Sequence, residues 1–134
     1  MKAKLATMFL MATVFLGLLA CSLATTKELS VDIASAGKEV TLATGGTLTI
    51  TLESNFTTGY SWNETAEIGD KTVIQQTDHK YQPPGTPMPG AGGKEVWIFK
   101  ALKAGKSTIS MGYARPFEKG VAPVKTFSLN VVVK

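Results

Sequence analysis

Side chains that carry out covalent or acid–base chemistry are scarce in this sequence of 134 residues. It contains one cysteine, Cys21, and one histidine, His79. A single histidine with no cysteine or second histidine nearby in the sequence makes a poor catalytic base, and most multi-histidine metal sites are excluded. We interpret His79 and its neighbour Asp78 as solvated loop residues. An enzyme is therefore the least favoured class, and we expect no catalytic residue, no metal and no cofactor.

Residues suited to binding gather instead in three segments. The first runs from Ser54 to Gly59, the second from Asp78 to Gly93, and the third from Ala114 to Val124. The second is the most unusual, because the fifteen residues 79–93 contain four prolines and four glycines. Prolines favour extended backbone, and glycines let another backbone approach closely. Long loops in compact domains are usually functional or disordered, so a binding loop and a floppy surface loop are the two interpretations.

The elements that must position these segments are strands. Leu48, Ile50 and Leu52 alternate with threonines, residues 107–113 and 125–133 alternate in the same way, and no segment after residue 26 has a helical period. We predict an all-β fold, an immunoglobulin-like β-sandwich of seven to eight strands with Trp97 and Phe99 in the core. The last seven strands are expected at 38–42, 47–53, 60–64, 71–77, 94–101, 107–113 and 125–133.

The strand order predicts that the three segments meet. If consecutive strands run antiparallel, the connections between them alternate between the two ends of the sandwich. The three unusual segments are alternate connections, so all three lie at the same end. Tyr60 and Trp62 are expected to pack beneath the first segment, because they alternate into the strand that follows it. The sequence thus predicts one binding edge made of three loops.

Each loop carries a motif that resembles one of the chagasin-like inhibitors of papain-type cysteine peptidases. Residues 55–62 are similar to the family motif N-P-T-T-G-Y-x-W, residues 90–93 to G-x-G-G, and residues 115–117 to R-P-W/F. The resemblance covers residues 27–134 and implies a reversible, competitive inhibitor with a sandwich fold. The peptidase-binding residues it implies are Asn55, Phe56, Thr57, Thr58, Gly59, Tyr60, Gly90, Ala91, Gly92, Gly93, Arg115, Pro116 and Phe117.

The resemblance also implies a role for each loop. Thr57, Thr58 and Gly59 would lie nearest the catalytic cysteine of the target. Gly92 and Gly93 would be small because the peptidase backbone comes close, in the manner of strand addition. Phe117 would be an aromatic anchor, whereas Arg115 either braces its loop or reaches the peptidase. Because the loops are separate, we expect substitutions in different loops to be nearly additive.

Two residues depart from the family motifs. Phe56 stands where the family has proline, which implies a less rigid first loop at that position. Phe117 stands where tryptophan is commoner, which removes an indole N–H and some stacking area. Neither departure changes the length of its loop. They affect affinity and selectivity more than function.

The N-terminus predicts export and lipid anchoring. Lys2 and Lys4 precede an apolar run of about fifteen residues, which suits a secretory signal and is too short for an ordinary membrane-spanning helix. The run ends in L-L-A-C, which resembles the lipobox of bacterial lipoproteins; a plain signal peptide with a chance cysteine is the alternative. We expect a lipoprotein signal peptide at 1–20, a tether at 21–26 lipidated on Cys21, and the inhibitor domain at 27–134. The expected location is the cell envelope, lipid-anchored at the outer membrane or facing the periplasm.

The expected partners are a papain-like cysteine peptidase and, through Cys21, a membrane. The formal net charge is +4, but no run of basic residues accompanies it, so no nucleic-acid partner is expected. We expect a monomer. The alternative function is a non-inhibitory envelope adhesion or assembly module that uses the same loop edge to bind another protein or a glycan.

We predict that Cys21→Ser abolishes acylation, because the thiol is the acceptor of the lipid. Metabolic labelling with a fatty acid should mark the wild type and leave the variant unlabelled. Equal labelling of both proteins would contradict the prediction. A soluble form that starts near Lys27 should still inhibit, since the tether lies outside the loops.

Overall fold

The computed structural model describes residues 26–85, 88 and 90–134. The regular elements of this part of the chain are strands and two short 3-10 helices. The expected signal peptide and Cys21 lie outside these residues. The elements are β1 (Thr26–Val31), η1 (Ile33–Ser35), β2 (Glu39–Ser54), η2 (Phe56–Thr58), β3 (Ser61–Trp62), β4 (Glu67–Ile68), β5 (Ile74–Gln82), β6 (Gly93–Ala101), β7 (Gly105–Ala114) and β8 (Lys125–Val133). The prediction of an all-β fold is confirmed.

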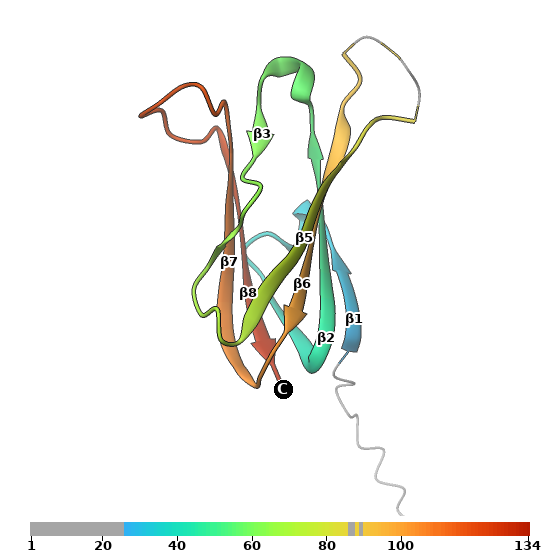
Figure 1. The fold of residues 1–134 in the computed structure, drawn as a ribbon, viewed down its shortest axis with the longest axis vertical. Helices are drawn as coiled ribbons and strands as arrows, with labels where there is room; N and C mark the ends of the chain where they lie inside the picture. Colours follow the sequence, from blue (N-terminus) through green and yellow to red (C-terminus); the bar gives the residue numbers. More distant parts are fainter. Residues whose placement is uncertain (1–25, 86–87, 89) are drawn as a thin grey trace, which may run out of the picture.

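One curled sheet forms both layers of the sandwich (Figure 1). The strand order is β3-β7-β8-β2-β6-β5, with β1 paired to β2 and β4 paired to β7. β2 connects the layers, because residues 39–42 pair in parallel with β8 and residues 47–54 pair antiparallel with β6. Between these two stretches lies Gly45, whose φ of 81° is in the region that favours glycine. The two strands expected at 38–42 and 47–53 are therefore the two halves of β2.

The core follows the alternation seen in the sequence. The side chains of Leu48, Ile50 and Leu52 in β2 are at most 1% exposed, and those of Trp97 and Phe99 in β6 are fully buried. β7 and β8 contribute their own alternating sets: Ile109, Met111, Tyr113, Phe127, Leu129, Val131 and Val133. Both layers thus present one apolar face, and burial of these faces is the main contribution to stability.

Some strand boundaries differ from those predicted. The strand expected at 60–64 is only Ser61–Trp62, and the strand expected at 71–77 is β5, at Ile74–Gln82. Asp78 and His79 are consequently strand residues, paired with Ile98 and Trp97 of β6, and their interpretation as loop residues is wrong. Their polar sequence misled the prediction because β5 is an edge strand, where polar residues are tolerated. The second loop therefore comprises residues 83–92.

We predict that Trp97→Ala lowers the free energy of unfolding by about 3–5 kcal/mol, because it removes a fully buried indole. The indole Nε1–H also donates to the backbone oxygens of Asn63 and Glu64, at 3.1 and 3.2 Å, and both bonds would be lost. Urea unfolding measures the change. Phe117→Ala is the control, since that ring is 71% exposed and its loss should change stability by less than about 0.5 kcal/mol. Equal stability of wild type and Trp97→Ala would contradict the placement.

Candidate functional site

Three loops project from one end of the sandwich, as the strand order predicted (Figure 1). The first loop joins β2 to β3, the second joins β5 to β6, and the third joins β7 to β8. In Figure 1 they lie at the top of the view, while β1 begins and β8 ends at the bottom. The sandwich therefore gathers segments that are about thirty residues apart in sequence into one edge.

The first loop is a preformed turn. Asn55 caps the 3-10 helix η2, and its side-chain Oδ1 accepts hydrogen bonds from the backbone N–H of Thr57 at 3.1 Å and from the Thr57 hydroxyl at 2.6 Å. The Thr58 hydroxyl donates to the backbone oxygen of Asn55 at 2.7 Å. Gly59 closes the turn with a φ of 79°, where a side chain would be strained. The loop thus holds its shape by its own bonds, and its helical backbone differs from the extended backbone of a peptide substrate.

The first and second loops are joined directly. The Asn55 side-chain Nδ2 donates to the backbone oxygen of Gly90 at 3.1 Å. The ring of Phe56 stacks on that of Tyr81, at the end of β5, with centroids 3.9 Å apart and an angle of 18° between the planes. In the second loop, the Ala91 N–H donates to the backbone oxygen of Met88 at 3.1 Å, shortly before β6 begins. One side of the first loop is therefore held by the second.

The third loop holds the other side of the first. The Arg115 Nε–H donates to the backbone oxygen of Thr58 at 3.3 Å, and its guanidinium lies 4.4 Å above the Tyr60 ring. A salt bridge of 3.1 Å to Glu118 orients the same guanidinium. Arg115 thus braces the loops in the free protein, which was one of its two expected roles. Phe117 is 71% exposed, and a side chain on Gly59 would come within 3.2 Å of its ring.

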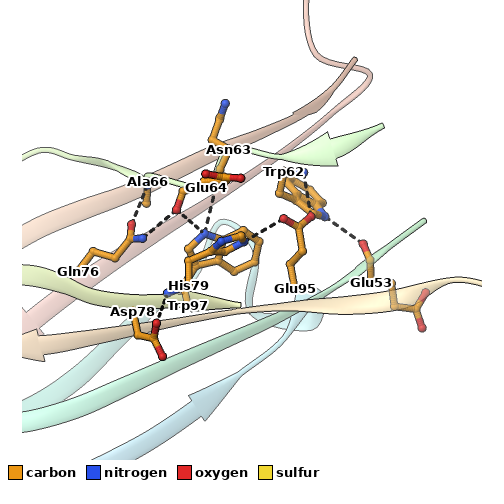
Figure 2. Close-up of polar contacts among 10 residues, drawn as sticks. All are labelled: Glu53, Trp62, Asn63, Glu64, Ala66, Gln76, Asp78, His79, Glu95 and Trp97. Atoms are coloured by element: carbon orange, nitrogen blue, oxygen red, sulfur yellow. Dashed lines mark hydrogen bonds and ion pairs between the residues drawn. The ribbon is translucent and has the colours of Figure 1, made fainter. Parts of the chain in front are cut away.

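The floor of the site contains a buried polar network that the sequence did not reveal (Figure 2). Glu95 in β6 is fully buried, and its Oε2 accepts the backbone N–H of Trp62 at 2.9 Å. The Nε2 of His79 lies 2.9 Å from the Glu95 Oε1, so His79 is a half-buried partner rather than a solvated residue. A signal for Glu95 was present, since it shares its strand face with Trp97 and Phe99 and so must point inward. Trp62 is buried beneath the first loop and Tyr60 packs against the core, as expected.

Packing within the chain explains why position 93 is a glycine. A Cβ at this position would overlap the backbone oxygen of Gln82 and lie 2.6 Å from the Tyr81 hydroxyl. Close approach of a peptidase is therefore not needed to explain this glycine. At Gly92 the nearest atoms would be 3.5 Å from a Cβ, which is ordinary contact, so Gly92 has the room for a side chain that Gly93 lacks.

The residues on the edge formed by the three loops are suited to binding another molecule. Within residues 26–85, 88 and 90–134, no three or more His, Cys, Asp or Glu side chains are arranged to hold a metal ion. No helix in the same residues is long and apolar enough to cross a membrane. The first loop is bonded to both of the others and Phe117 is exposed beside it, so this edge is a surface whose shape is set before a partner binds.

The chain belongs to the chagasin family of peptidase inhibitors, since residues 41–131 match the family described as chagasin family peptidase inhibitor I42. It is 35% identical to amoebiasin-2 of Entamoeba histolytica over 85 residues, and this matched stretch covers 63% of this chain and 68% of that protein. It is 33% identical over 84 residues to chagasin of Trypanosoma cruzi, which covers 60% of this chain and 76% of chagasin. As a family member it is a cysteine peptidase inhibitor and not an enzyme.

Solved structures share the fold. The crystal structure of the cysteine protease inhibitor EhICP2 from Entamoeba histolytica superposes with a TM-score of 0.67 at 24% identity, over 80% of this chain and 96% of that one. The structure of PbICP-C in complex with falcipain-2 gives a TM-score of 0.54 at 22% identity, over 82% of this chain and 92% of that one. Both likenesses support the immunoglobulin-like sandwich described above.

We predict that Gly93→Ala lowers the free energy of unfolding by about 1–3 kcal/mol, because the new methyl group must displace Gln82 or Tyr81. Gly92→Ala is the matched control one residue away, and it should change stability by less than about 0.5 kcal/mol. Urea unfolding of both variants checks the difference. If both variants are as stable as wild type, the close packing around Gly93 is wrong.

Proposed function

We propose that the protein inhibits papain-like cysteine peptidases reversibly and competitively, by placing the three loops in the active-site cleft. The observation that carries this proposal is that all three family motifs lie on one edge, with the first bonded to both of the others. A competitive inhibitor must fill the cleft without presenting a peptide bond in attack geometry. The helical turn of η2 meets this requirement, because its backbone is not extended as a substrate would be.

Each loop has a distinct task in this mechanism. The first loop, with Thr57, Thr58 and Gly59 at its tip, enters nearest the catalytic cysteine. The second loop lies along one wall of the cleft, where backbone groups near Gly92 pair with the peptidase. Phe117 in the third loop packs on an apolar surface on the other side, and its 71% exposure leaves the ring free to do so. The falcipain-2 complex of PbICP-C, which has the same fold, supports a target of the papain type.

Preformed loops favour tight binding. Association of two proteins through a standard interface of about 1,600 Å² is opposed by the entropy lost when side chains and loops become ordered. Here Asn55 and Arg115 already fix the loops in the free protein. Less ordering remains for the moment of binding, so more of the contact energy contributes to affinity.

The proposed location is the cell envelope, with the chain anchored through an acylated Cys21 as a monomer. β1 starts at the end of the sandwich opposite the loops (Figure 1). A tether joined to Thr26 would therefore leave the loop edge facing away from the membrane, accessible to a peptidase. Acyl chains contribute roughly 0.8 kcal/mol per buried methylene to such anchoring.

We predict that Thr58→Trp raises the inhibition constant for papain at least about tenfold, a loss of about 1.4 kcal/mol. An indole is too large for a narrow cleft, and the substitution also removes the hydroxyl bond to Asn55. Thr58→Ser is the matched control, because it keeps that hydroxyl and adds no bulk. Steady-state inhibition with a peptide substrate measures the change, and wild type should raise the apparent KM without lowering kcat.

Phe117→Ala should weaken inhibition less than Thr58→Trp, because it removes contact area without a clash. The expectation of additive effects is revised, since Arg115 bonds to Thr58 and the Phe117 ring lies against Gly59. Residues in contact generally couple, so the double variant should differ from the sum of the two losses.

If the wild type leaves papain fully active, the adhesion or assembly module becomes the favoured function. If Thr58→Trp inhibits normally while Phe117→Ala abolishes inhibition, the third loop is the main anchor.

A further inference from the structure

We propose that Tyr81 is a positioning residue for the inhibitory loop, and that its stack with Phe56 fixes that loop as a proline would. The proposal rests on the proposed function and adds a residue to it that lies outside all three motifs. Tyr81 belongs to β5, whereas Phe56 is the first residue of η2. Their ring centroids are 3.9 Å apart and the ring planes are 18° from parallel, so the two rings stack face to face.

Tyr81 is itself held firmly. It pairs with Glu95 in the ladder between β5 and β6, so its backbone is part of the sheet. Its hydroxyl lies over Gly93, where a Cβ would be only 2.6 Å away. The absence of a side chain at Gly93 therefore makes the space in which the tyrosine ring lies. The tyrosine ring is therefore carried by a paired strand and lies over the glycine.

Phe56 passes this constraint to the loop tip. Its backbone oxygen accepts the N–H of Gly59 at 3.0 Å, which is the bond that closes the turn. Between these two residues lie Thr57 and Thr58, the residues proposed to enter the cleft. Fixing the Phe56 ring on Tyr81 consequently fixes the start of the turn, and with it the direction in which both threonines are presented.

The local backbone also suits a proline at position 56. Asn55 has φ −122° and ψ 93°, so its backbone is extended and lies outside the helical region that a following proline disfavours. Position 56 is the first of the helical turn, where proline is well accommodated because its missing N–H has no partner in the helix. A proline would limit the loop through its φ angle, whereas Phe56 limits it through a contact with the sheet. The phenylalanine therefore does not imply a looser loop, provided that Tyr81 is present.

A brace of this kind predicts a rescue that an ordinary structural contact would not give. Tyr81→Ala should weaken inhibition of papain about fivefold to tenfold, mainly through a slower association rate, because the loop must first adopt its binding shape. Tyr81→Phe keeps the stack and should stay within about twofold of wild type. When Phe56→Pro is already present, adding Tyr81→Ala should cost less than about twofold, since no ring remains to be supported. Phe56→Leu is the matched control: it also removes the ring but supplies no fixed φ, so it should lose the association rate that Phe56→Pro retains.

A second measurement does not depend on a peptidase. Backbone ¹⁵N relaxation of the free protein reports the order of Thr57, Thr58 and Gly59. Tyr81→Ala should lower the order parameters of these residues, Tyr81→Phe should not, and Phe56→Pro combined with Tyr81→Ala should restore them. Failure of wild type to inhibit papain, with this pattern intact, would refute the proposed function and leave the brace standing. Unchanged order parameters in Tyr81→Ala, or an equal cost of Tyr81→Ala with and without Phe56→Pro, would overturn the brace.

Discussion

The loop end of the sandwich depends on how the buried carboxyl group of Glu95 is satisfied. A polar group without exposed surface costs several kcal/mol unless it is hydrogen-bonded. Both oxygens of Glu95 have partners, one in the Trp62 backbone of β3 and one in the His79 side chain of β5. Since β3 lies in one layer of the sheet and β5 and β6 in the other, this residue ties the layers together beneath the loops (Figure 2).

On this floor the loops are bonded to one another. Asn55 reaches the second loop through Gly90, and Arg115 reaches the first loop through Thr58, so the first loop is held from both sides. Each bond joins residues far apart in the sequence and is made in the free protein. The entropy of ordering is therefore lost on folding rather than on binding, which suits an inhibitor that must compete with substrate.

The two phenylalanines that depart from the family motifs have different surroundings. Phe56 is 43% exposed and lies on the ring of Tyr81, so part of its surface is used within the chain. Phe117 is 71% exposed, and it remains largely available to a partner. A substitution in a binding motif can thus alter either the shape of the loop or the contact that it offers, and the neighbouring side chains decide which.

The sequence by itself determined the all-β class, the inward face of each main strand and the edge on which the loops meet. These follow from alternation and strand parity, which are local or depend only on strand order. The sequence did not determine which groups His79 contacts, why position 93 must be a glycine, or which residues join the loops. Glu95 must point inward by parity, but the groups that satisfy it are sixteen and thirty-three residues away. Which side chains meet across such distances depends on how the layers pack, so only the tertiary structure decided it.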